Sequence, residues 1–139
     1  MRGDDDDAAP LLARAKSQAL LEAPPEQMLG LLAKQSAELL ARAARLLAVG
    51  ESVGPEDPLL NDVRERGRAA TRSDLLEVAK AMKHAGLLKR GMSPGRAADI
   101  MYSIAASESV YLRLVDHRGW STAAYARMLK RALAGALRL

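Results

Sequence analysis

The chain of 139 residues contains no cysteine and very few aromatic residues: no phenylalanine, one tryptophan and three tyrosines. Without cysteine there can be no disulfide scaffold, no thiolate metal site and no cysteine nucleophile. With so few aromatic residues, the hydrophobic core must be built mainly from Leu, Ala, Val, Ile and Met. Because Leu and Ala favour helices and β-branched residues are scarce, the composition predicts an all-α fold.

Long apolar runs and targeting signals are also lacking. No stretch approaches the roughly 18 apolar residues of a membrane span. The N-terminus carries the acidic run Asp4 to Asp7 instead of the basic and apolar start of a signal peptide. These absences predict a cytoplasmic protein with no membrane partner. We expect residues 1–8 to form a disordered acidic tail, followed by one helical domain over residues 9–139.

Charge is unevenly distributed along the chain. Lys and Arg outnumber Asp and Glu by 11 to 3 in residues 80–139, whereas residues 1–79 hold 10 basic and 14 acidic side chains. A basic half can indicate binding to nucleic acid or to a membrane surface. Here the basic residues are spread along the expected helices, and aromatic side chains for base stacking are nearly absent. We therefore interpret them as the solvated faces of helices.

Hydrophobic spacing and helix-breaking residues predict a bundle of five or six helices with no strand. The expected helices are Pro10–Glu22, Pro25–Val49, a third from Pro58 to about Leu88 with a break near residues 67–73, Pro94–Asp116 and Thr122–Leu137. Ser93 and Ser121 are the expected N-cap residues of the last two helices. Residues 94–116 are apolar on more than one side, which is typical of a helix buried on more than one side.

No catalytic or metal-binding motif is present. The two histidines, His84 and His117, lie far apart and have no His, Cys or carboxylate partner at the spacing of metal ligands. The motifs of serine hydrolases, P-loop proteins and dinucleotide-binding domains are absent. We therefore expect no catalytic residue, no metal and no cofactor, and the chain is not predicted to be an enzyme.

Hydroxyl-bearing residues gather between Tyr102 and Ser109, in a helix that is otherwise apolar. Gln35 and Ser36 interrupt the leucine face of the helix over residues 25–49 in the same way. Buried hydroxyl groups need hydrogen-bond partners. They either bond back to the helix backbone or line a mainly apolar ligand cavity with a few polar anchors.

The apolar stripe of residues 122–137 also has two interpretations. It can cap the core of its own chain, or it can pair with its copy in a second subunit. The small residues Ala132, Gly135 and Ala136 permit a close approach between helices. Two long apolar helices at the end of a small all-α chain favour an isologous dimer that is made from both.

A constellation of residues fills the stretch from residue 88 to the end. It consists of Gly91-Met92-Ser93, Ala97-Ala98-Asp99-Ile100, Ser107, Val110-Tyr111, Leu114-Val115, Arg118-Gly119-Trp120-Ser121 and Tyr125. This pattern resembles the C-terminal end of tetracycline-repressor (TetR) family transcriptional regulators. Upstream, residues 10–90 are similar to that family in helix order and composition. The chain departs from the family at Glu108, where related members often carry proline, and in lacking the three-helix DNA-binding head.

The resemblance implies the effector-binding and homodimerisation domain of such a regulator. DNA would be reached only through the missing N-terminal helix-turn-helix. A small apolar or amphipathic effector would control repression by favouring one arrangement of the dimer. The implied ligand-binding residues are Met28, Leu32, Gln35, Ser36, Leu39, Met82, Tyr102, Ser103 and Ser107. The last two helices of each subunit would form a four-helix interface through Tyr111, Leu114, Val115, Trp120, Tyr125, Met128, Leu129, Ala132, Leu133 and Leu137.

The alternative is a headless interaction protein that forms heterodimers with an intact regulator and binds no ligand. A cavity between the helices separates the two interpretations. An open cavity favours an effector-binding domain, whereas a fully packed core favours the interaction protein.

Overall fold

The computed structural model describes residues 15–53 and 57–138 of the chain. After a helical segment at residues 15–22, the elements are α2 (Pro25–Val53), α3 (Pro58–His84), α4 (Pro94–Ala105), α5 (Glu108–Tyr111), the π-helix η2 (Leu112–His117) and α6 (Thr122–Leu137). The described residues form no strand, so the predicted all-α class is confirmed for them. The expected acidic tail at residues 1–8 lies outside the described residues.

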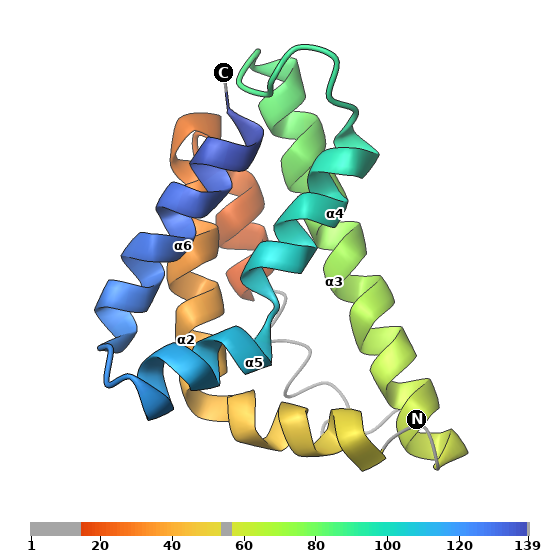
Figure 1. Cartoon of the computed structure of the whole chain (residues 1–139). Coiled ribbons are helices and arrows are strands. Elements are labelled where there is room, and N and C mark those ends of the chain that lie inside the picture. Colours follow the sequence, from red (N-terminus) through yellow and green to blue (C-terminus); the bar gives the residue numbers. More distant parts are fainter. Residues whose placement is uncertain (1–14, 54–56, 139) are drawn as a thin grey trace.

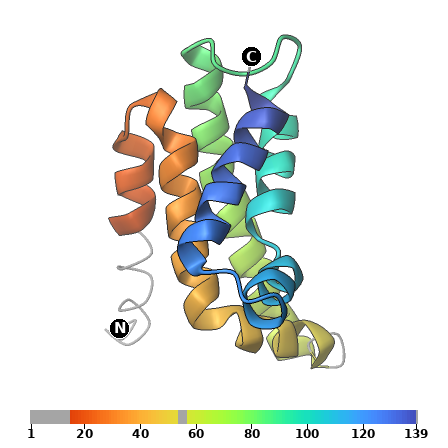
Figure 2. The ribbon, with the colours of Figure 1, turned by 60° about the vertical axis from the view of Figure 1, so that its left-hand side comes forward.

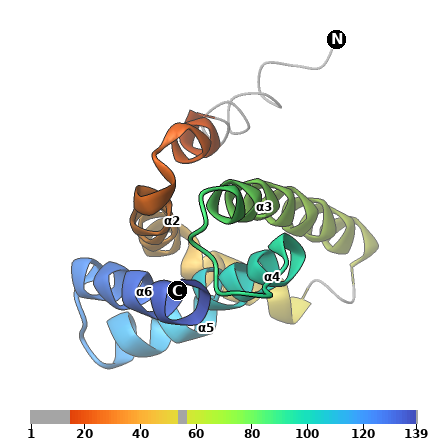
Figure 3. The same cartoon turned by 90° about the horizontal axis from the view of Figure 1, so that it is seen from above.

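Two helix pairs make up the body of the molecule. α2 packs against α6 and α3 packs against α4, while contacts between α4 and α6 join the two pairs (Figure 1). Residues 15–22 lie on the outer side of α2, as the turned view shows (Figure 2). Seen from above, α2 and α6 lie on one side of the bundle and α3 on the other, with α4 between them (Figure 3).

Several predicted helix ends are confirmed. Residues 15–22 are separated from α2 at Ala23 and Pro24, and α2 begins at Pro25. The Ser93 hydroxyl accepts a hydrogen bond from the backbone N–H of Arg96 (3.1 Å) at the start of α4. Ser121 caps α6 in the same way, accepting from the backbone N–H of Ala124 (3.0 Å). In both helices the serine satisfies a backbone donor that has no partner inside the helix.

Other predicted boundaries are wrong. α2 continues past Gly50 to Val53, and α3 runs without a break through residues 67–73. A single glycine costs a helix only about 1 kcal/mol, so Gly67 does not by itself end α3. The end of α3 at His84 agrees with the expected region, and Gly86 follows with a φ of +73° that favours glycine.

The expected helix over residues 94–116 is in fact divided. α4 ends at Ala105, and the Ser107 hydroxyl accepts a hydrogen bond from the backbone N–H of Val110 (3.3 Å) to cap a new helix. The π-helix η2 then carries the chain to His117. The division therefore comes from a serine that caps a new turn, although no proline stands at Glu108.

The core is built from aliphatic side chains, as the composition predicts. Its largest fully buried side chains are Met28, Val78, Met82, Met101, Tyr125, Leu129, Leu133 and Leu137. α6 contributes four of them, which recur at every fourth residue and so occupy one face of the helix. The apolar stripe of α6 therefore fills the core of its own chain.

The C-terminal end of α6 is attached to the loop between α3 and α4. The backbone N–H of Lys89 donates to the carbonyl of Leu137 (2.8 Å), and its ammonium group donates to the carbonyl of Gly135 (2.7 Å). Leu88 and Arg138 form an isolated antiparallel bridge at the same place. These bonds satisfy carbonyl groups that the end of a helix leaves without partners.

Two tyrosines meet in the core but differ in their hydrogen bonding. The rings of Tyr111 and Tyr125 pack edge to face, with centroids 4.9 Å apart. The Tyr111 hydroxyl pairs with the Thr122 hydroxyl at 3.2 Å. The Tyr125 hydroxyl is buried and has no hydrogen-bond partner among the described residues. Burial, with smaller contributions from Tyr111 and Glu108, raises the pKa of Tyr125 to about 12.

This difference predicts opposite effects for two similar substitutions. Tyr125→Phe removes a buried polar group without a partner, so the free energy of unfolding should stay unchanged or rise by up to ~1 kcal/mol. Tyr111→Phe removes a satisfied hydrogen bond, so that free energy should fall by about 0.5–1.5 kcal/mol. Urea denaturation at pH 7 measures both. If Tyr125→Phe lowers the free energy of unfolding as much as Tyr111→Phe does, the Tyr125 hydroxyl must have a hydrogen-bond partner, and this account of the two tyrosines is wrong.

The raised pKa of Tyr125 gives the same residue an alkaline signature. The unfolded chain ionises this phenol near its ordinary pKa of 10, whereas the folded chain keeps it neutral up to about 12, so the free energy of unfolding falls as the pH rises between these values. The Tyr125→Phe variant lacks this phenol, so its free energy of unfolding should fall less than that of the wild type between pH 10 and 12. Urea denaturation of both proteins at several pH values in this range measures the difference.

Candidate functional site

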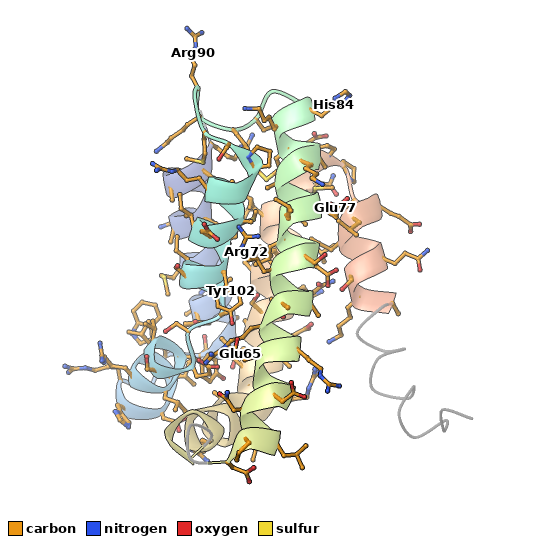
Figure 4. All side chains as sticks on the ribbon, turned by 90° about the vertical axis from the view of Figure 1, so that its right-hand side faces the viewer. Glu65, Arg72, Glu77, His84, Arg90 and Tyr102 are labelled. Carbon is orange, nitrogen blue, oxygen red and sulfur yellow. The ribbon has the colours of Figure 1, made fainter. Side chains whose placement is uncertain are left out.

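An open groove of about 500 Å³ lies between α3 and α4. This volume falls within the roughly 300–1,000 Å³ of small-molecule sites, but five of the seven lining residues are exposed, so it is a surface groove and not an enclosed cavity. Its lining residues are Glu65, Arg68, Ala69, Arg72, Asp99, Tyr102 and Ser103. Figure 4 shows three of them, Glu65, Arg72 and Tyr102, along the line where the two helices meet.

Helical spacing explains why these residues share the groove. On α3 the lining residues from Glu65 to Arg72 follow one another at intervals of one, three or four residues, which keeps them on one side of the helix. On α4 the intervals between Asp99, Tyr102 and Ser103 have the same effect. The small side chain of Ala69 leaves space between the longer side chains around it.

Two ion pairs border the groove. Arg72 Nε lies 3.0 Å from a carboxylate oxygen of Asp99 and joins α3 to α4, whereas Arg68 pairs with Glu65 on α3 at 3.1 Å. The arginine side chains are 38% and 47% exposed, and the carboxylate side chains of Glu65 and Asp99 are 59% and 65% exposed. In both pairs the arginine side chain, stem included, is the less exposed partner relative to its own size.

Hydrogen-bond donors remain available in the groove. Arg72 donates to Asp99 through Nε, and its two Nη groups make no hydrogen bond with any described residue. Tyr102 is half-buried, and its hydroxyl has no hydrogen-bond partner in the described part of the chain. Ser103 instead donates to the backbone carbonyl of Asp99 (2.9 Å). Its hydroxyl therefore bonds back to the backbone of its own helix, which is one of the two roles expected for these hydroxyl groups.

A smaller pocket of about 210 Å³ lies between α2 and the segment formed by α5 and η2. It is lined by Leu40, Ala41, Arg42, Ala44, Arg45, Tyr111, Leu112 and Asp116. Arg45 donates to one carboxylate oxygen of Asp116 through Nε (2.9 Å) and Nη2 (2.6 Å). Because this volume is below the usual range for small-molecule sites, the groove between α3 and α4 is the stronger candidate.

The structure does not gather the nine expected ligand-binding residues into one cavity. Tyr102 and Ser103 line the groove between α3 and α4, and none of the nine lines the smaller pocket. Three of them are buried in the hydrophobic core: Met28, Leu32 and Met82. Their side chains contribute to packing and line neither space.

The remaining four expected ligand-binding residues lie elsewhere. Gln35 donates to the backbone carbonyl of Lys16 (3.1 Å) and so attaches residues 15–22 to α2. Ser36 is partly buried on α2, and Leu39 is 50% exposed on the same helix. Ser107 caps α5.

The ten expected dimer-interface residues divide into two groups by burial. One group is buried within a single chain and is not available to a second subunit: Tyr111, Tyr125, Leu129, Leu133 and Leu137. The other group keeps exposed apolar surface: Leu114, Val115, Trp120, Met128 and Ala132. An interface between copies of the chain must therefore use the second group.

The charged residues of the groove were not anticipated from the sequence. In the sequence, Glu65, Arg68 and Arg72 are typical of the solvated face of a helix. Asp99 appears there only as part of the pattern that resembles the TetR family. Arg72 and Asp99 are 27 residues apart, so no local spacing relates them. The sequence signal that does relate the α3 residues is their recurrence at helical intervals, in line with the face that carries Leu75, Leu76 and Ala79 further along the helix.

Other kinds of site find no support among the described residues. They contain no group of three or more His, Cys, Asp or Glu side chains placed to hold a metal ion. None of the helices formed by residues 15–53 and 57–138 is both long and apolar enough to cross a membrane. Comparisons of the chain with protein-family models, curated protein sequences and solved structures find no match.

A pair of neighbouring substitutions tests whether the groove binds small molecules. Ala69 lines the groove, whereas the adjacent Ala70 does not, and both are exposed. Ala69→Phe should fill the groove and weaken binding of the neutral dye N-phenyl-1-naphthylamine at least about tenfold, equivalent to about 1.4 kcal/mol. Ala70→Phe should leave binding unchanged. Fluorescence titration measures both variants, and equal dye affinities in the two would rule out this groove as the binding site.

Proposed function

We propose that the chain is the effector-binding and homodimerisation domain of a TetR-like transcriptional regulator. The observation that carries the proposal is the groove between α3 and α4, which has the size of a small-molecule site and includes Tyr102 and Ser103 in its wall. The family resemblance of residues 88–139 assigns the same two residues to the effector.

The position of the groove supports a route from ligand binding to the dimer. α4 carries Asp99, Tyr102 and Ser103, and the chain continues directly through α5 and η2 into the turn before α6. A ligand that prefers one spacing of α3 and α4 would shift the position of α5 and η2 with α4. The ligand changes the arrangement of the dimer only to the extent that it binds one arrangement more tightly.

The half-exposed apolar residues of η2 and α6 supply the proposed dimer interface. Leu114 and Val115 lie on η2, Trp120 lies in the turn after it, and Met128 and Ala132 lie on α6. A second copy placed against them would remove apolar surface from water, which is favourable. A twofold symmetric contact uses the same surface on both subunits, so this one region is sufficient.

The proposed interface predicts the mass of the wild-type chain and of a variant in solution. The wild-type chain should have a mass of about 30 kDa by light scattering after size exclusion, twice the 14.9 kDa of one chain. Val115→Glu combined with Met128→Glu should place charges in the interface and give a folded monomer. Both side chains are only partly buried within one chain, so the helical circular dichroism signal should be retained.

Two matched variants complete this test. Leu59→Glu changes a leucine that is 73% exposed on α3 and should leave the dimer intact. Leu129→Asp with Leu133→Asp places charges in the core and should unfold the chain instead of producing a folded monomer. A wild-type chain that stays at 14.9 kDa at high protein concentration would contradict the proposal.

A second candidate function is heterodimerisation with an intact regulator, without any ligand. It is favoured by the burial of Met28, Leu32 and Met82 in the core, where the resemblance implies an effector cavity. This function predicts that the chain binds no dye in the groove, whereas Val115 and Met128 would still contact a partner. The dye titration therefore separates the two functions.

A further inference from the structure

We propose that the groove between α3 and α4 selects anionic amphiphiles, that is, compounds with a planar apolar body and a carboxylate or sulfonate group. This inference rests on the proposed function, because it names the class of ligand that the same groove would bind. Its basis is the set of hydrogen-bond donors that Arg72 and Tyr102 present in the groove, with the positive charge of Arg68 on the same wall.

The basic and acidic side chains of the groove differ in exposure. The lining is formally neutral, with the two arginines balanced by Glu65 and Asp99. The arginine side chains are nevertheless less exposed than the carboxylates, at 38% and 47% against 59% and 65%. The carboxylates are thus the more solvated partners of the two ion pairs.

The available hydrogen bonds point to the same class of ligand. Arg72 has two Nη groups that make no hydrogen bond with a described residue, and the Tyr102 hydroxyl has no partner there either. Guanidinium groups bind carboxylate and similar oxyanions through paired hydrogen bonds. Arg68 lies one helical turn from Arg72 on the same wall, so it adds positive charge at the same position.

The carboxylate of Asp99 occupies the position that a ligand anion would take. It contacts Arg72 through Nε at 3.0 Å and is itself 65% exposed. Exposed ion pairs contribute only about 0–1 kcal/mol, so exchanging Asp99 for a ligand anion costs the fold little. The methyl group of Ala69 and the ring of Tyr102 offer apolar surface to the planar body of the ligand.

A pair of fluorescent dyes tests this selectivity. 1-Anilinonaphthalene-8-sulfonate and N-phenyl-1-naphthylamine share one ring skeleton, and only the first carries a sulfonate. We expect the full wild-type chain to bind the sulfonate at least about fivefold more tightly than the neutral dye. A favourable charge–charge interaction in a partly buried groove accounts for a difference of this size.

Substitutions at the Arg72–Asp99 pair should have opposite effects on the sulfonate. Arg72→Gln should weaken its binding about tenfold and leave the neutral dye unchanged, because the paired donors are lost. Asp99→Asn should strengthen its binding a few-fold, because it removes the competing anion. Circular dichroism confirms that each variant is folded.

Matched controls carry the same charge changes at other places. Arg90→Gln alters an exposed arginine in the loop between α3 and α4, far along the molecule from Tyr102 (Figure 4). Glu77→Gln alters an acid that pairs with Lys80 and does not line the groove. Neither control should change the affinity for either dye.

The outcomes distinguish this inference from the function on which it rests. If both dyes bind equally, or if Arg72→Gln weakens them to the same extent, the preference for anions is overturned and effector binding in the groove stands. If Asp99→Asn weakens binding of the sulfonate, the role assigned to Asp99 as the competing anion is overturned. If neither dye binds the folded wild-type chain, the effector-binding function itself fails.

Discussion

The burial of one face of α6 is the packing interaction on which the other elements depend. Tyr125, Leu129 and Leu133 are almost completely excluded from water, and the helix contacts both α2 and α4. Because α4 also packs on α3, α6 connects the two helix pairs of the bundle. Hydrogen bonds from Lys89 to the end of α6 fix this helix to the loop that precedes α4. The position of α4, and so the shape of the groove, depends on this packing.

The same burial restricts where a second subunit can bind. Since the inner stripe of α6 is used within the chain, a partner that binds this helix has to contact its partly exposed apolar residues and those of η2. The proposed ligand site lies on the far wall of α4, against α3. α4 therefore has one side toward the core and another toward the groove, and it leads through α5 and η2 to the proposed interface. Because α4 joins the groove to the proposed interface in this way, we connect ligand binding with the relative position of the two subunits.

Local sequence signals predicted the elements well, whereas contacts between distant residues were not predictable. Ser93 and Ser121 act as N-caps because capping depends on neighbours within three residues. Gly67 was expected to break α3, but one exposed glycine costs a helix only about 1 kcal/mol, and α3 continues through it. The inner and outer residues of α6 could not be separated from the sequence, because an apolar stripe fits a core and an interface equally well. The Arg72–Asp99 pair joins residues 27 positions apart and has no local signature.

The most direct test of the account is sedimentation velocity of the full chain with 1-anilinonaphthalene-8-sulfonate, recorded at an absorption band of the dye. This measurement reports the mass of the species that carries the ligand. The account predicts that the dye sediments with a species of twice 14.9 kDa. A chain that sediments at 14.9 kDa, with all of the dye left behind as free small molecule, would contradict it.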